Sequence, residues 1–257
     1  GGVYYPMGGG MAAILSKYVP GWEATAEVTG ASVANLQLIG QGKQDIGFTM
    51  ADAAYDAVSG LAKFKDRKVE ARTLMVLYPN KMHVVTTEAS GIKTLADLKG
   101  KRISVGAPRS GTELNARTIF EAAGITYKDF SKVEYLPFGE SVELMKNRQL
   151  DVTLQSAGLG VASLRDLATS VDIVVVPIPA DVVKKTNDPA YIPAAIPANT
   201  YKGQTADVVS ATVQNYLVTH EGVSNDTVYA MTKALWTGLD NLVAAHSAAK
   251  SIDQKRA

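Results

Sequence analysis

The start of one predicted helix carries residues suited to binding an anion. A short apolar strand over 102–105 is followed by Gly106 and then by the loop that enters this helix. The residues of the loop are Arg109, Ser110, Gly111 and Thr112. A helix N-terminus leaves backbone N–H groups unpaired and carries the positive end of the helix dipole, which favours a carboxylate or a phosphate. Ser110 and Glu113 also match a capping box, in which the hydroxyl satisfies only its own helix.

The order of predicted elements around this loop occurs twice in the chain. In each half of the chain a glycine turn precedes a helical pattern, a polar turn and a short apolar strand. The two copies span 30–49 and 139–155, and a glycine-rich loop entering a helix lies upstream of each, at 1–18 and 106–123. Two such units predict two similar lobes, each a parallel sheet flanked by helices.

Residues in and directly after the two copies supply further candidate ligand contacts. For the first copy they are Ser32, Asn35 and Asp52, which follows the strand end. For the second they are Gln155, Ser156 and Gly158, which end the strand that matches 48–49. Asp52 could accept a ligand ammonium group or cap the helix after it. Ser32 could equally be an N-cap.

Longer side chains extend this set of candidates. Arg109 could pair with a carboxylate through two hydrogen bonds or remain a surface charge. Asn115 lies one turn into the same helix and faces either the cleft or solvent. Tyrosines offer an apolar wall with a polar tip, although core packing is the commoner role of any one of them. The tyrosines at candidate positions are Tyr4, Tyr5, Tyr78 and Tyr191.

The composition restricts which classes of protein this chain can belong to. A chain of 257 residues, 46% hydrophobic and 20% charged, is ordinary globular material and suffices for two lobes of about 100 to 150 residues. The 26 basic and 25 acidic residues are mixed along the chain, so nothing indicates binding to nucleic acid or to an anionic membrane surface. Cysteine is absent, which excludes disulfides and thiolate chemistry. No apolar run approaches the roughly 18 residues of a membrane span.

The sequence offers little for catalysis. Of the three histidines, His83 lies in a predicted strand among apolar neighbours, while His220 and His246 fall near segment ends, far from the predicted binding loops. None has a carboxylate or serine partner at motif spacing, and no cluster has metal-ligand spacing. Residues 8–10 form a glycine run without the Gly-Lys-Ser/Thr of a P-loop. We therefore expect no catalytic residue, no metal and no cofactor.

Periodicity and turn residues predict the remaining elements. Helices are expected over 11–18, 53–59, 94–99 and 226–246. Strands are expected over 24–28, 74–78, 82–87, 133–136, 172–177 and 208–218. The five prolines of 177–197 predict a largely irregular connection. Because 1–6 has the form of a loop that follows a strand, we expect a strand, and a signal peptide before it, upstream of residue 1.

Eight segments carry a family pattern in order along nearly the whole chain. They are 2–6 (GVYYP), 29–36 (TGASVANL), 48–52 (FTMAD), 77–85, 91–102 (GIKTLADLKGKR), 105–113, 191–198 and 230–235. Together they resemble the TAXI group of extracytoplasmic solute-binding proteins, which serve TRAP transporters. The segment 91–102 is the least specific of them, because many two-lobed binding proteins carry something similar.

The resemblance implies an α/β type II periplasmic-binding fold, in which two α/β lobes hold a small solute in a cleft. The chain would cross between lobes near 87–89 and 210–213, so that lobe 1 comprises 1–88 and 211–257 and lobe 2 comprises 89–210. The candidate residues above would line the cleft, at the carboxyl ends of strands.

The resemblance also implies the ligand, the partners and the location. The expected ligand is glutamate, glutamine or a related carboxylate, the partners are TRAP transporter membrane subunits, and the location is periplasmic. We expect a monomer that binds no nucleic acid. Two other classes share the fold: an enzyme, for which catalytic residues are lacking, and a ligand-sensing domain of a regulator, which would normally carry a DNA-binding helical unit. A signal peptide in the full-length gene would favour transport over regulation.

Overall fold

Residues 2–256 are described by a computed structural model, in which the chain divides into two compact units. Unit 1 groups the first two residues with Asn80–Val213, and unit 2 groups Val3–Pro79 with Gln214–Ala257. Two long strands, β2 (Ala71–Thr87) and β8 (Val208–His220), each belong partly to one unit and partly to the other. The transitions between the units fall after Pro79 and Val213.

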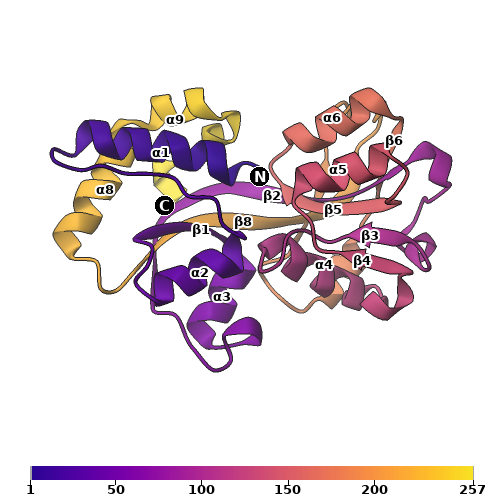
Figure 1. Cartoon of the computed structure of the whole chain (residues 1–257), viewed down its shortest axis with the longest axis horizontal. Coiled ribbons are helices and arrows are strands. Elements are labelled where there is room, and N and C mark those ends of the chain that lie inside the picture. Colours follow the sequence, from indigo (N-terminus) through magenta and orange to yellow (C-terminus); the bar gives the residue numbers. More distant parts are fainter. Residues whose placement is uncertain (1, 257) are drawn as a thin grey trace. The chain divides into compact units, whose positions relative to one another are not determined.

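Unit 2 is a helical layer on a short antiparallel ladder (Figure 1). Its elements are α1 (Tyr4–Tyr18), α2 (Ser32–Gly40), β1 (Ile46–Met50), α3 (Ala51–Ser59), η1 (Ala62–Phe64), α8 (Asn225–Thr237), α9 (Leu239–Ala245), η5 (Ser247–Ser251) and η6 (Gln254–Arg256). Strand β1 pairs antiparallel with β8, from Ile46 opposite Thr219 to Met50 opposite Asn215. The core joins α1 to α8 and α9 through buried side chains that include Met11, Leu235 and Leu242.

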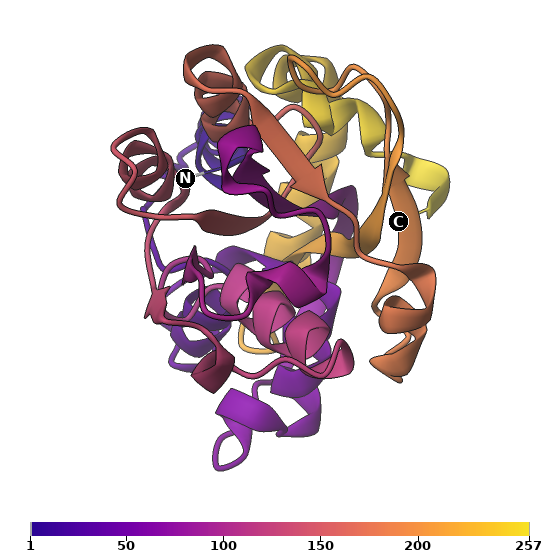
Figure 2. The same ribbon diagram turned by 90° about the vertical axis from the view of Figure 1, so that its right-hand side faces the viewer.

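Unit 1 is a mixed sheet covered on both faces (Figure 1; Figure 2 views it end-on). Its strands are β3 (Arg102–Ser104), β4 (Lys132–Glu134), β5 (Val152–Ala157), β6 (Ile173–Val176) and β7 (Ile192–Ile196). Its helices are η2 (Glu88–Ser90), η3 (Leu95–Leu98), α4 (Gly111–Ala122), η4 (Tyr127–Asp129), α5 (Phe138–Lys146), α6 (Ala162–Ser170) and α7 (Ala180–Lys185). Strands β4, β3 and β5 run parallel, β5 and β6 pair antiparallel with β2, and β7 pairs antiparallel with β8. Helices α5 and α6 cover one face and α4 the other.

The predicted repeat is present, with a difference in strand direction. The order α2–β1–α3 in unit 2 matches α5–β5–α6 in unit 1. In both copies a threonine of a long strand binds the backbone just before the repeated strand. Thr219 Oγ1 of β8 donates to the Asp45 carbonyl at 2.6 Å, and Thr86 Oγ1 of β2 donates to the Asp151 carbonyl at 2.7 Å. However, each repeated strand pairs antiparallel with that long strand, so the expectation of purely parallel sheets was wrong.

Strand β2 continues where the sequence predicted two strands and a turn at Pro79-Asn80. The carbonyl of Tyr78 accepts a hydrogen bond from Asn215 Nδ2 at 2.7 Å, and the carbonyl of Asn80 accepts one from Thr212 Oγ1 at 2.6 Å. Side chains of β8 thus bind the backbone on each side of Pro79, which itself lacks an N–H group. The extended chain is stabilised without a turn.

The proline-rich stretch 177–197 is also more regular than predicted, because its prolines occupy positions that tolerate them. Pro179 is the N-cap of α7, where a missing N–H group costs nothing. Pro193 lies in β7, which among the described residues pairs only with β8 and is therefore an edge strand.

At two places that contain glycine, the helices differ from those predicted from the sequence. The predicted helix 226–246 is broken at Gly238 into α8 and α9, where an added Cβ would lie 2.7 Å from Ile14 Cγ2. Conversely, Gly8 and Gly10 belong to α1 rather than to a loop. A Cβ at Gly10 would lie 2.9 Å from Ala245 Cβ, so this glycine allows α1 and α9 to pack closely.

The segment 24–28 was predicted as a strand, but it forms none. It has no regular secondary structure, and no strand of residues 2–256 pairs with it; Val28 is 72% exposed. Alternating apolar residues therefore did not suffice here, because a strand also requires a neighbour for its backbone groups.

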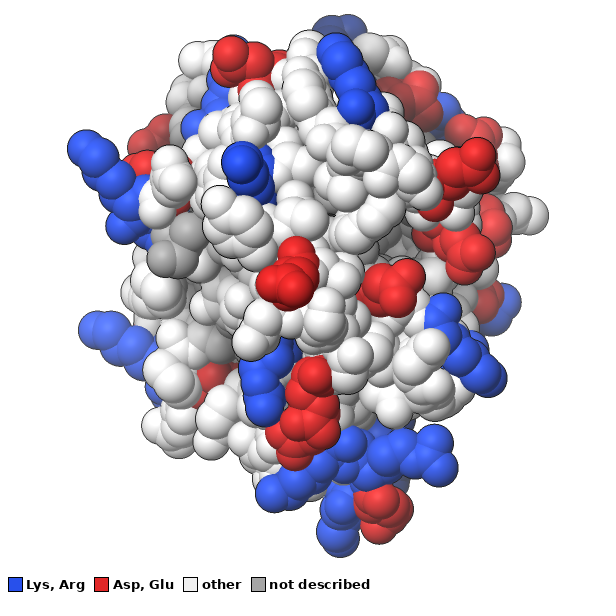
Figure 3. Space-filling view, turned by 90° about the vertical axis from the view of Figure 1, so that its left-hand side faces the viewer, with Lys and Arg blue, Asp and Glu red and all other residues white. Residues whose placement is uncertain are grey.

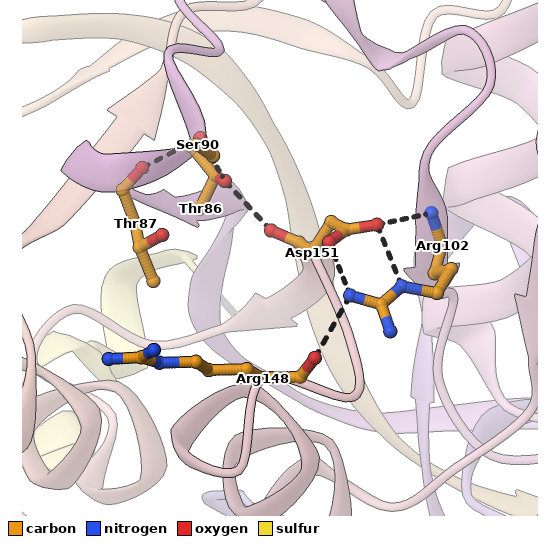
Figure 4. Close-up of polar contacts among 6 residues, drawn as sticks. All are labelled: Thr86, Thr87, Ser90, Arg102, Arg148 and Asp151. Atoms are coloured by element: carbon orange, nitrogen blue, oxygen red, sulfur yellow. Dashed lines mark hydrogen bonds and ion pairs between the residues drawn. The ribbon is translucent and has the colours of Figure 1, made fainter.

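An ion pair joins the amino ends of β3 and β5 (Figure 4). Asp151 accepts three hydrogen bonds from Arg102: from the backbone N–H at 2.8 Å, from Nε at 3.0 Å and from Nη2 at 2.7 Å. Arg102 Nη2 also donates to the Arg148 carbonyl at 3.0 Å. These bonds to Arg102 hold the pKa of Asp151 below its ordinary value.

We expect Asp151→Asn to lower the free energy of unfolding at pH 7 by about 1 to 2 kcal/mol, a lowering of the melting temperature by about 2 to 8 °C. Since the folded pKa is depressed, the stabilisation is complete above the ordinary aspartate pKa and is lost as the pH falls through the folded value. The difference between variant and wild type should therefore shrink in acid denaturation curves as the pH falls below about 4. Asp181→Asn, which breaks an exposed pair with Lys185, is the control and should change stability by less than about 0.5 kcal/mol. Equal losses in both variants would contradict the assignment.

Candidate functional site

The N-terminus of α4 in unit 1 presents a set of hydrogen-bond donors. Gly106 has φ +92°, and a Cβ there would lie 2.7 Å from Thr112 Cβ, so the loop after β3 packs tightly against the first turn of the helix. Ser110 is the N-cap, and its Oγ accepts the Glu113 N–H at 3.1 Å. The capping prediction is therefore confirmed. It leaves the Ser110 hydroxyl proton and the N–H groups of Gly111 and Thr112 without an intrahelical acceptor.

Glu113 completes only half of the predicted capping box. Its Oε1 accepts from Arg117 Nη2 at 2.6 Å and from the Tyr127 hydroxyl at 3.2 Å, while the Ser110 N–H donates to the Ala107 carbonyl. Arg117 also lies over the Tyr127 ring at 4.6 Å. The buried carboxylate near the helix N-terminus is thus neutralised by a cation, which removes a repulsion that an incoming anion would otherwise meet.

Strand β5 brings a second group to the α4 face of the sheet. Val85 lies opposite Thr153 and packs in the core formed with α5 and α6, so Thr153 and Gln155 share that face. Because side chains alternate along a strand, Ser156 lies on the opposite face of the sheet. Helix α4 covers that face (Figure 1). Its residue is 5% exposed, and its Oγ has no hydrogen-bond partner within residues 2–256. A buried hydroxyl without a partner is unfavourable unless another molecule supplies one.

The other predicted residues of unit 1 differ in what they contact. Asn115 and Tyr191 are buried and joined, Nδ2 donating to the hydroxyl oxygen at 3.0 Å. Gly158 is buried directly after β5. Arg109 is exposed with φ +61°, a backbone region that side chains other than glycine rarely adopt. Gln155 faces the other side, where its Oε1 accepts from Ser163 Oγ at 2.7 Å.

Sequence reasoning missed a buried histidine network beside Gln155. His83 is fully buried; its Nδ1 lies 3.2 Å from the Gln155 carbonyl, and its Nε2 lies 2.9 Å from the Tyr201 hydroxyl. A carbonyl can only accept, so Nδ1 carries the proton and Nε2 accepts from Tyr201. Burial lowers the pKa of His83 to about 4 and raises that of Tyr201. No motif in the sequence signals this pair, which lies 118 residues apart.

Unit 2 holds its own buried polar cluster. The Tyr4 hydroxyl donates to Asn215 Oδ1 at 2.6 Å, and its ring stacks on Phe48 at 5.0 Å. Burial raises the pKa of Tyr4, a hydrogen bond with Ser32 opposes this, and the nearby Asp52 carboxylate adds to it. Asp52 is 2% exposed in the first turn of α3. The cluster therefore places an acidic group among hydroxyls at the carboxyl end of β1.

Several predicted residues of unit 2 already have structural partners. Asn35 donates to the Phe48 carbonyl at 2.8 Å and accepts from the Thr29 hydroxyl. Ser32 is the first residue of α2 rather than its N-cap, and its Oγ accepts the Met50 N–H at 3.2 Å. Tyr78 is buried in β2, and burial raises its pKa. Tyr5 is half exposed.

Residues 2–256 contain neither a metal-binding cluster nor a membrane-spanning helix. No group of three or more His, Cys, Asp or Glu side chains could hold a metal ion. No described helix is both long enough and apolar enough to cross a membrane.

The fold is that of the periplasmic solute-binding proteins. SsuA from Escherichia coli, the periplasmic aliphatic sulphonate binding protein, superposes with a TM-score of 0.55 at 16% identity, over 93% of this chain and 71% of its own. A binding protein component of a phosphonate ABC transporter from Pseudomonas aeruginosa superposes with a TM-score of 0.60 at 13% identity, over 92% of this chain and 73% of its own. A mutant of ArgBP from T. maritima superposes with a TM-score of 0.55 at 12% identity, over 93% of this chain and 80% of its own. A family model matches residues 1–257, and the chain belongs to the NMT1-like family.

The His83 network predicts how stability depends on pH. Because the folded pKa of about 4 lies below the ordinary value of about 6.5, the unfolded chain binds the proton first as the pH falls. Stability should therefore decrease between about pH 6.5 and 4, by up to about 3 kcal/mol. In urea titrations over this range, His83→Gln should be less stable at pH 7 but lose this slope, whereas the control His220→Gln should keep it. An unchanged slope in His83→Gln would refute a neutral, buried His83.

Proposed function

We propose that this chain is an extracytoplasmic solute-binding protein of the TAXI type, which captures a small carboxylate or amino acid and delivers it to the membrane subunits of a TRAP transporter. It performs no chemical conversion of the solute. Membership of the NMT1-like family and the fold of transporter binding proteins support the solute-binding role. The ordered sequence segments that resemble the TAXI group support the finer assignment.

One observation carries the choice of ligand chemistry: the Ser156 hydroxyl, which has no hydrogen-bond partner within residues 2–256, lies on the face of the sheet that α4 covers, and the start of α4 is rich in donors. Backbone N–H groups, the Ser110 proton and the Ser156 hydroxyl all suit an acceptor such as a carboxylate. The named ligands of two structural neighbours, a sulphonate and a phosphonate, are likewise anions. We assign the ligand carboxylate to this set of donors, with Thr112, Asn115, Gly158 and Tyr191 shaping its surroundings.

Unit 2, taken by itself, holds an acidic cluster. Asp52 is a buried acidic residue among the Tyr4 and Ser32 hydroxyls, a set suited to a ligand ammonium group. The resemblance to the TAXI group favours glutamate, glutamine or a related carboxylate as the ligand.

Ser156→Ala separates a binding role from a structural one. Removing a hydroxyl that has no partner should leave the free protein as stable as wild type or more stable, whereas the affinity for L-glutamate should fall roughly tenfold or more. Unfolding by urea and calorimetric titration measure the two effects.

Ser141→Ala is the matched control for Ser156→Ala. Its hydroxyl is also buried but donates to the Pro137 carbonyl at 3.1 Å, so we expect lower stability and unchanged affinity. A Ser156→Ala protein that loses stability and keeps wild-type affinity would contradict the proposed site.

A thermal-shift screen tests the solute class. Ligand at about a hundred times its dissociation constant adds about 2.7 kcal/mol, or about 5 to 11 °C at this chain size. L-glutamate, L-glutamine, 2-oxoglutarate and C4 to C6 dicarboxylates are the expected binders. If only sulphonates or phosphonates shift the midpoint, the anion site stands and the carboxylate assignment fails; if none of these solutes does, the whole proposal fails.

Arg109→Gly forms a second arm of that screen, because glycine accepts φ +61° without strain and only the side chain is lost. If the guanidinium binds a second carboxylate, the variant should lose affinity for glutamate and keep it for glutamine. Equal affinities in wild type and variant would leave Arg109 as a surface charge.

A further inference from the structure

The loop that follows α3 in unit 2 is basic and firmly held. Phe64 and Val69 are buried, and the Val69 N–H donates to the Ala57 carbonyl at 2.9 Å. Two more backbone bonds close the turns, from Phe64 N–H to the Leu61 carbonyl and from Arg67 N–H to the Phe64 carbonyl. The backbone is therefore fixed while the residues between the two anchors point outward.

Four cations project from this loop. They are Lys63, Lys65, Arg67 and Lys68, all exposed, and no ion pair within residues 2–256 involves any of them. With Asp66 as the only acidic residue, the segment 62–68 carries a net charge of +3 in a chain whose total is +1. Figure 3 shows basic side chains gathered around an acidic one at the lower edge of unit 2, where Figure 1 places this loop.

Exposed apolar side chains lie next to these cations. Tyr55 is 60% exposed, Val58 43% and Leu61 45%. Tyr55 and Val58 lie three residues apart and so share one side of α3, and Leu61 follows at the start of the basic loop. Cations beside exposed aromatic and aliphatic groups form the combination that adsorbs at a bilayer surface, where the charges meet anionic headgroups and the apolar groups reach the acyl boundary.

We propose that the basic loop 62–68, together with Tyr55, Val58 and Leu61, docks unit 2 on an anionic phospholipid bilayer. Charge complementarity favours this partner, and the apolar neighbours favour a lipid surface over a nucleic acid, which offers no acyl layer. The balanced charge of the whole chain predicted no such affinity, because it averages over a local excess that only the folded loop concentrates. The inference does not depend on which solute the protein binds.

Vesicle sedimentation tests this docking surface directly. At low salt, the full chain should bind vesicles of 60% phosphatidylcholine and 40% phosphatidylglycerol, and should bind pure phosphatidylcholine at least about tenfold more weakly. A basic residue near an anionic surface contributes about fivefold in binding, equivalent to about 1 kcal/mol, so the quadruple variant Lys63→Gln, Lys65→Gln, Arg67→Gln, Lys68→Gln should lose at least about tenfold. Tyr55→Ser should weaken binding by a smaller factor that persists at high salt.

A second quadruple variant controls for net charge. Lys128→Gln, Lys184→Gln, Lys202→Gln and Lys250→Gln remove four exposed cations that are spread along the chain, and the net charge falls to −3 as in the first variant. This control should sediment as wild type does. The proposal is overturned if both quadruple variants lose binding equally, if pure phosphatidylcholine binds as well as the anionic mixture, or if the protein binds heparin but no vesicle.

Discussion

Backbone pairing along β2 is the constraint on which the rest of unit 1 depends. A strand buried on both faces must have its N–H and carbonyl groups satisfied, and residues 84–86 of β2 pair with both β5 and β6. The same register sets His83 opposite Gln155 and Met82 opposite Ser156. A slip of one residue would exchange the two faces of β5, so that Ser156 would no longer face α4. The position of the candidate site is therefore a consequence of strand register.

Local signals in the sequence predicted elements well where the cause is itself local. The short helix capped by Thr94 is present with a full capping box, and α3 ends at Gly60 in the left-handed conformation as expected. The failures arose where a distant partner decides. Hydrogen bonds from β8 keep the strand extended through Pro79, and close approach to Ile14 requires the break at Gly238. Neither partner is visible from the residues around these positions.

The candidate site also has parts that the sequence predicted and parts that only the tertiary structure reveals. Residue types at strand ends identified the hydroxyls and the acid, and the cap at Ser110 was predicted from spacing alone. Whether a polar atom is already engaged depends on the tertiary structure: Asn35 and Gln155 have partners, while the Ser156 hydroxyl has none among the described residues. Arg117, which neutralises Glu113, was missed because a lysine or arginine four residues after a glutamate is ordinary in any helical sequence.

The discontinuity of unit 2 has a consequence for biosynthesis. Its core joins α1 to α8 and α9, yet more than a hundred residues of unit 1 separate these segments in the chain. Ribosomes add about 5 to 20 residues per second, so the apolar stripe of α1 waits on the order of 10 s for its partners. Unit 1 has all of its residues once Val213 has emerged and can fold first. A nascent chain of this protein therefore carries one unit that can already fold and one that is still incomplete, and unit 2 folds last although it holds residues 3–79.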